Sequence, residues 1–333
     1  MFKNQSLFAL LFLLYSTAQY GQYTDEINSN RPGKSMSSFS VGKTIFQTEF
    51  GLSYIDEKND DTDFKAQAWS SDLDLRYGAF FEQLEFIANL NYYNESYKFP
   101  GGDGHEAALR RVTLGAKYMI YDPEMNYEPK PNLYSWKANH KFNWRQFIPA
   151  IGLYGGFHFN LAKDKFARTG LWKENDMTAK GMIITQNQFG RYTFVMNFIL
   201  DQFPSQRNSF DYILTLTRGF NSRVSGMFEI QGINGENYKD HYMRIGGAYL
   251  FQKNMQIDAS IGSNLQYAPK IMYANIGFSW RFEGQYSDYM LRIPKDKNEG
   301  KSKMDKKFQK EKDKQKEKKK KRLDAVESGE KTN

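Results

Sequence analysis

The chain has 333 residues, no cysteine, 27 Phe, 22 Tyr and 5 Trp, and a formal net charge of +8. Residues 295–333 hold 16 Lys or Arg and 9 Asp or Glu, which leaves 30 basic against 29 acidic residues in 1–294. Because residues 1–294 are nearly neutral, they offer no basic surface for binding the phosphates of a nucleic acid. The absence of cysteine excludes a disulfide scaffold, thiol catalysis and a thiolate zinc site, and a mean hydropathy of −0.71 without a long apolar run excludes a helical membrane protein but not a β-barrel, whose strands alternate.

The N-terminus has the pattern of an export signal. Lys3 precedes the apolar run 7–15 and the small exit Ser16-Thr17-Ala18, and this order is typical of a secretory signal peptide. A cut after Ala18 is the first choice and one after Gly21 the second; the alternative is a buried N-terminal helix. We predict a signal peptide over 1–18 and an N-terminal periplasmic or plug segment over 19–42.

Residues 43–282 repeat one unit, an alternating segment followed by polar turn residues. In one segment Ala274, Ile276 and Phe278 share one face, while Asn275 and Gly277 share the other, because successive strand residues point to opposite faces. Twelve such segments are predicted as strands: 43–55, 64–78, 83–96, 109–121, 145–161, 177–189, 191–201, 209–219, 223–233, 241–252, 254–264 and 271–282.

Connection length separates the folds that alternation alone leaves open, a secreted β-sandwich or propeller and a membrane barrel. Tight turns such as Gly190-Arg191 alternate with longer polar stretches: 56–63, 97–108, 162–176, 202–208, 234–240 and 265–270. Short turns on one side and long loops on the other are typical of outer-membrane barrels. The connection 122–144 is an exception, because it is long but lies on the side of the short turns; it is predicted to be a periplasmic excursion, a long loop on that side. The fold class is therefore all-β, a transmembrane antiparallel up-and-down β-barrel of about twelve strands.

The start of this region resembles a known family. Arg31-Pro32-Gly33 precedes a first strand that contains Gln47, Glu49 and Gly51, and this combination resembles bacterial outer-membrane barrels of the Bacteroidota type named after the meta-pathway of phenol degradation. The resemblance covers about 25–282 and implies a channel or uptake protein for small, often aromatic, solutes. Some barrels of this kind serve instead as subunits of larger outer-membrane machines, and the long basic tail, which lies outside the family core, keeps that possibility open.

The inward face is predicted from strand phase. It carries six acids and five bases as lumen-lining candidates: Glu49, Asp72, Asp74, Arg76, Glu85, Arg111, Lys117, Glu229, Arg244, Asp258 and Arg281. Interior charges must be hydrated or paired. The set can line a water-filled pore or form an ion-pair network that closes the barrel.

No catalytic or metal site is predicted. The four histidines, His105, His140, His158 and His241, have no close partner at metal-ligand spacing. Asp240 and His241 are adjacent in a strand and point to opposite faces. Each histidine is interpreted as a surface residue, and we expect no enzyme activity and no cofactor.

The C-terminal region 283–333 is predicted to be a Lys-rich periplasmic tail, disordered or a solvated helix. Its charged stretch ends with the basic residues Lys318-Lys319-Lys320-Lys321-Arg322. We predict that these residues bind peptidoglycan or other envelope proteins; the alternative is a tail that only increases solubility. An even strand count places both termini in the periplasm. We expect outer-membrane lipid as a partner of the barrel, and the export signal excludes nucleic acid as a partner. The leading functional hypothesis is a porin-like or solute-uptake channel, and the alternative is a closed structural subunit of an assembly or export machine.

Overall fold

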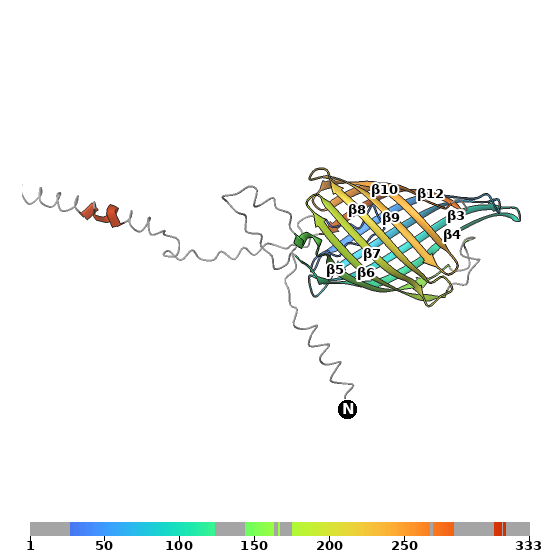
Figure 1. Cartoon of the computed structure of the whole chain (residues 1–333), viewed down its shortest axis with the longest axis horizontal. Helices are drawn as coiled ribbons and strands as arrows, with labels where there is room; N and C mark the ends of the chain where they lie inside the picture. The colour runs from blue at the N-terminus through green and yellow to red at the C-terminus, as the bar shows by residue number, and fades with distance from the viewer. Residues whose placement is uncertain are drawn as a thin grey trace, which may run out of the picture. The chain divides into compact units, whose positions relative to one another are not determined.

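The computed structural model describes residues 27–123, 144–162, 166, 175–266, 269–282, 310–314 and 316–317. Twelve antiparallel strands form a closed barrel in which each strand pairs with its neighbours in sequence and β1 pairs with β12 (Figure 1). The strands are β1 (Phe46–Asn59), β2 (Phe64–Gly78), β3 (Leu84–Phe99), β4 (Gly102–Tyr121), β5 (Ala150–Asn160), β6 (Met177–Phe189), β7 (Tyr192–Phe203), β8 (Ser209–Gly219), β9 (Val224–Gly235), β10 (Lys239–Gln252), β11 (Met255–Asn264) and β12 (Lys270–Phe282). The predicted all-β barrel of about twelve strands is confirmed.

The two faces of the wall differ in chemistry. On β12 the outward Met272 and Ile276 are 53% and 60% exposed, whereas the inward Asn275 and Ser279 are 5% and 0% exposed. Apolar side chains outside and polar side chains inside are the arrangement of a barrel that spans a lipid bilayer. In the part of the chain that the structure describes, no helix is both long and apolar enough to cross a membrane.

Several strand ends differ from the prediction. The stretch 97–108 was predicted to be a loop, but β3 and β4 stay paired up to Phe99 and Gly102, because a hairpin that extends into water can carry polar residues on both faces. The predicted strand 145–161 begins only at Ala150 and is preceded by a 3₁₀-helix, η1 (Trp144–Phe147), since Pro149 has no N–H to donate to a ladder. Part of the predicted contrast in connection length is therefore strand rather than loop.

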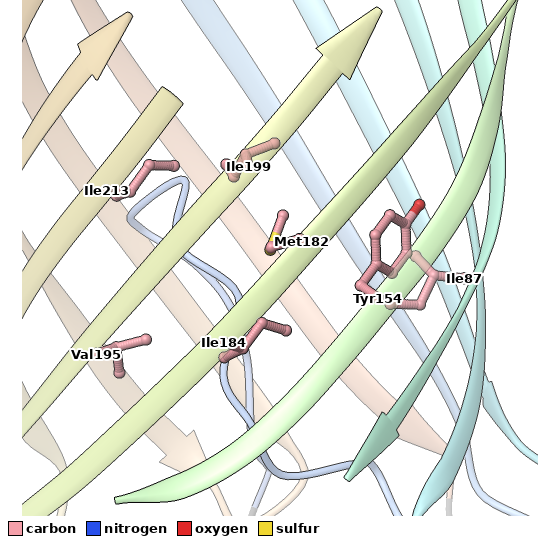
Figure 2. Packing of buried hydrophobic residues seen from close by; sticks show 7 residues of the cluster. All are labelled: Ile87, Tyr154, Met182, Ile184, Val195, Ile199 and Ile213. Atoms are coloured by element: carbon pink, nitrogen blue, oxygen red, sulfur yellow. The ribbon is translucent and has the colours of Figure 1, made fainter. Parts of the chain in front are cut away.

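The barrel interior holds residues 28–41, called the plug segment below. Met36 of this segment packs against an inward apolar cluster on one side of the wall. Figure 2 shows the cluster, which consists of Ile87, Tyr154, Met182, Ile184, Val195, Ile199 and Ile213. The lumen therefore has an apolar side on β3 and β5–β8 in addition to its predicted charged face.

Residues Gln285–Asn333 are a separate C-terminal unit, of which the structure describes residues 310–314 and 316–317 as helical. The predicted signal peptide, the basic stretch Lys318–Arg322 and most of the predicted excursion 122–144 lie outside the described residues.

Candidate functional site

The eleven charged residues predicted for the interior lie on the inward face of their strands. Eight of them are buried: Glu49, Arg76, Glu85, Lys117, Glu229, Arg244, Asp258 and Arg281. Three are partly buried: Asp72, Asp74 and Arg111. The structure divides the set into separate groups, each of which also contacts the plug segment or a neighbouring strand.

Adjacent strands β1–β4 build a continuous charge network. Arg76 on β2 bridges Glu49 on β1 at 2.6 Å and Glu85 on β3 at 2.5 Å, and Lys117 on β4 reaches Glu85 at 3.1 Å. All four side chains are 0% exposed. Alternating signs keep every buried charge in this group paired, which is the condition for burying charge at all.

A second group lies on β8–β10. Arg244 on β10 contacts Glu229 on β9 at 2.5 Å, and Thr215 on β8 donates a hydrogen bond of 2.7 Å to the same carboxylate. The remaining bonds come from the plug segment, whose backbone N–H groups of Lys34 and Ser35 donate to Glu229 at 3.1 and 3.2 Å. One buried carboxylate thus connects three strands, β8–β10, and the plug segment.

Two amide side chains bind the middle of the plug segment. Asn197 accepts a hydrogen bond from the Met36 N–H at 2.6 Å and donates one to the Met36 carbonyl at 2.9 Å. Gln186 accepts from the Ser38 N–H at 3.1 Å. An extended segment without a strand partner would leave its backbone groups unsatisfied when buried, and these wall side chains supply the missing partners.

The charge network of β1–β4 also contacts the plug segment. The Lys117 ammonium donates to the carbonyls of Ser37 at 3.0 Å and Phe39 at 2.8 Å, and Glu85 accepts from the Val41 N–H at 3.1 Å. The network therefore has two roles, in pairing wall charges and in holding a polypeptide inside the lumen.

The Arg-Pro-Gly motif is where the plug segment meets β11 and β12. The Arg31 guanidinium lies 3.3 Å from the Asp258 carboxylate, with side chains 6% and 0% exposed, and it also hydrogen-bonds Asn275. A Cβ atom on either Gly51 or Gly277 would overlap the guanidinium. Glycine at these two wall positions leaves the space that Arg31 occupies.

The other motif residues contribute to the same docking. Glu49 accepts from the Asn30 N–H at 3.2 Å, and Gln47 donates to Glu49 at 2.7 Å. A Cβ atom on Gly33 would lie 2.5 Å from the Glu229 carboxylate. The six motif residues, Arg31, Pro32, Gly33, Gln47, Glu49 and Gly51, are therefore brought together at the contact between the plug segment and the wall.

Within the described part of the chain, the three partly buried candidates form no ion pair with the buried network, although Asp74 lies directly opposite Glu49 in the β1–β2 register. Asp72 pairs with Lys34 of the plug segment at 3.2 Å, whose side chain is 46% exposed. Asp74 and Arg111 are hydrogen-bonded to asparagine side chains on the next strand.

The interpretation of His158 as a surface residue is wrong. The side chain is buried in the lumen, with Thr113 Oγ1 at 2.6 Å from one ring nitrogen and Asp201 at 2.8 Å from the other. The phase of β5, whose alternate residues Ile151 and Leu153 face outward, carries the signal that places His158 inside.

The remaining histidines differ from His158. His105 and His241 are exposed, and Asp240, next to His241, is 0% exposed on the opposite face; His140 lies outside the described residues. Within the described ranges, no group of three His, Asp or Glu side chains has the spacing of a metal site. Further inward acids that the sequence reasoning missed are Glu57, Glu95, Asp201, Asp211 and Asp240.

Comparison with known proteins gives one family and several distant folds. A family model described as "Putative MetA-pathway of phenol degradation" matches residues 29–282. Among solved structures, similarity is found to a KdgM porin (10% identity, TM-score 0.41, covering 70% of this chain and 99% of that chain) and to the P. putida toluene transporter TodX (10% identity, TM-score 0.37, 72% and 90%). The translocator domain of the autotransporter NalP from Neisseria meningitidis is similar at 6% identity (TM-score 0.41, 72% and 88%). No curated protein matches the chain significantly.

Proposed function

The chain belongs to the family of the MetA pathway of phenol degradation, and from this premise we propose that it is a porin-like channel for small solutes in a bacterial outer membrane, with its lumen occupied by the plug segment. The apolar outer face and the polar inner face support placement in a membrane. In this proposal the protein carries out no chemical reaction, and selectivity comes from the groups that line the lumen.

One observation carries the proposal: a separate segment of chain fills the lumen, and side chains of the wall hold it by polar contacts. A barrel that is only structural can fill its interior with packed wall side chains. Here Glu229, Asn197 and Gln186 bind backbone groups of the plug segment. If the segment leaves, water can take over each of these hydrogen bonds, and the wall that remains is largely polar.

A reversible lock tests whether the plug segment closes the channel. The hydroxyls of Ser29 in the plug segment and Ser279 on β12 lie 2.8 Å apart, so the double variant Ser29→Cys/Ser279→Cys is suited to a disulfide in a chain that has no other cysteine. In planar bilayers we expect the oxidised variant to be silent and the reduced variant to give open-channel steps. The single variant Ser29→Cys is the matched control and should not respond to the oxidant.

The same experiment separates the proposal from its rival, a structural subunit of a larger outer-membrane machine. The buried network of Arg76, Glu85 and Lys117 favours the rival, since it binds the plug segment to three strands, β2–β4. Silence of both the oxidised and the reduced variant, together with stable co-purification of other envelope proteins, would support a closed subunit.

The C-terminal unit belongs to this question of partners. We propose that its basic stretch, Lys318–Arg322, binds peptidoglycan or an acidic envelope protein, with both termini in the periplasm. Deletion of residues 295–333 should remove these partners from native pull-downs and leave channel conductance unchanged. If the same proteins are pulled down with and without the tail, the tail serves only to increase solubility.

A further inference from the structure

A cavity of about 230 Å³ lies between the plug segment and the wall of β6–β11. It is located toward the end of the barrel that carries the turns Gly190-Arg191 and 253–254, since its wall includes Gln186, Thr193 and Ser225 near those strand ends. The volume corresponds to about eight waters at about 30 Å³ each, or to a solute with on the order of ten non-hydrogen atoms.

Most of the residues that line the cavity carry neutral hydrogen-bonding groups. The wall contributes Thr193, Thr217, Ser225 and Gln256, and the plug segment contributes asparagine and serine residues. Hydroxyl and amide groups both donate and accept hydrogen bonds. This double capacity matches a ligand whose own groups are hydroxyls.

The one charged residue in the lining is already engaged. The Arg31 guanidinium is directed at Asp258 and Asn275 in the β11–β12 wall, and its carbonyl accepts from Gln256 at 3.2 Å. Acids that could neutralise a cation are likewise committed, since Glu229 is bound by Arg244 and by the plug segment. A charged solute would therefore enter without a free counter-charge, at a large desolvation cost.

The neighbouring apolar cluster does not change this chemistry. Val195 belongs to both the cluster and the cavity lining, but most other lining groups are polar. A hydrophobic solute in this space would leave hydroxyls and amides without partners, which is unfavourable when they are buried. The charged face on β1–β4 lies on the other side of the plug segment, against Lys117 and Glu85.

We propose that this cavity is a binding site for small, uncharged, hydroxyl-rich solutes of the size of a pentitol or a monosaccharide. The proposal rests on the proposed function only for passage of the solute through the barrel. Binding of the solute to the cavity needs a docked plug segment and does not need an open channel. In this proposal the solute binds in the polar cavity beside the plug segment, whereas the apolar cluster packs against Met36.

The test uses the full-length protein in lipid nanodiscs and three probes of similar length: xylitol, its carboxylate analogue xylonate, and 1-pentanol. After subtraction of the signal from empty nanodiscs, saturation-transfer NMR should detect xylitol and give little signal for xylonate or pentanol. Equal or stronger binding of xylonate or pentanol, or no binding of xylitol, overturns the proposal.

Variants locate the binding site. Thr217→Val and Ser225→Ala remove two lining hydroxyls with little change in volume. Each hydrogen bond lost weakens binding roughly fivefold, so the double variant should weaken xylitol binding by more than about tenfold. Thr185→Val, on the outward face of β6, is the matched control and should bind as the unmodified protein does. If the double variant binds xylitol as well as the control does, xylitol does not bind in this cavity.

The outcome is independent of the channel experiment. Xylitol binding by a protein that never conducts would retain the site and refute the channel. Open-channel steps without xylitol binding would retain the channel and refute the site. Heat-modifiable mobility on gels, which reports a closed barrel, verifies that each variant is folded before it is compared.

Discussion

Replacing Arg31 should release the plug segment more than any other single change in that segment. The pair of Arg31 and Asp258 is 3.3 Å apart, with side chains 6% and 0% exposed. Arg31→Ala leaves the buried Asp258 carboxylate without its cation, and breaking a buried pair in this way costs about 3–5 kcal/mol. Because release of the plug segment lets water reach the carboxylate, this cost falls on the docked state. The docking equilibrium should shift by roughly 150- to 4,000-fold, at about 1.4 kcal/mol per tenfold.

Thiol accessibility measures this shift directly, because the chain has no native cysteine. In a Met36→Cys background the new thiol lies against the lumenal apolar cluster when the plug segment is docked. Its rate of reaction with a membrane-impermeant thiol reagent in proteoliposomes reports the released population. Adding Arg31→Ala should raise that rate by two orders of magnitude or more, up to the rate of the unfolded chain.

Lys34→Ala is the matched control, since it removes the same charge from the same segment. The Lys34 side chain is 46% exposed and pairs with Asp72 at 3.2 Å; a pair this accessible contributes about 1 kcal/mol or less, so the rate should rise about fivefold at most. If Arg31→Ala and Lys34→Ala give equal rates, or if neither differs from the background, then burial of the Arg31 pair does not hold the plug segment and the reasoning fails.

Three further outcomes are expected. Gly51→Val should release the plug segment as Arg31→Ala does, because its side chain would overlap the guanidinium; thiol rates that stay at the Met36→Cys background level would contradict the close packing. Glu229→Gln should lower the free energy of unfolding by about 3–5 kcal/mol, since it removes the buried carboxylate that pairs with Arg244, and urea titration of the refolded barrel measures it. Ile276→Lys, on an outward side chain that is 60% exposed, should cost about 2–4 kcal/mol in a bilayer and little in detergent; equal costs in both media would argue against a lipid-facing position.

The wall of the barrel could be predicted because a strand carries its orientation in its own sequence. The alternation around Asn275 and Ile276 assigns one residue to the lumen and the next to the outside. Because the side chains of a strand alternate with a period of two, assigning one residue fixes the orientation of all the others in the strand. The same reasoning placed Glu49, Lys117 and Glu229 inside, where they are buried. Strand count and inward charges are therefore local information.

His158 was missed although the same local information was present. It was interpreted as a surface residue because no partner lies near it in the sequence, whereas its partners in space, Thr113 and Asp201, lie on β4 and β7. Strand phase alone would have put it in the lumen. Identification of its partners requires the register between strands, which alternation does not contain.

The docking of the plug segment could be predicted only in outline. A lumenal position was one of two choices for residues 19–42, but an irregular segment has no period from which its contacts can be read. Its partners are far away in sequence, as in the pair of Arg31 and Asp258 or the bonds of Met36 to Asn197. The Arg-Pro-Gly motif indicated a family, and its physical role became visible only when the glycines of the wall were placed against it.

The chemistry of the contact indicates why such a segment can be both specific and reversible. Its apolar anchor is Met36, while neutral side chains such as Gln186 and Asn197 bind its backbone groups. Each hydrogen bond exchanged for water contributes only about 0.5–1.5 kcal/mol net, so these bonds fix the position of the segment more than they stabilise it. The buried pair of Arg31 and Asp258 differs, because breaking it leaves a charge that must be hydrated. A channel built in this way should have one contact that decides whether the plug segment is docked, and many that decide only where it lies.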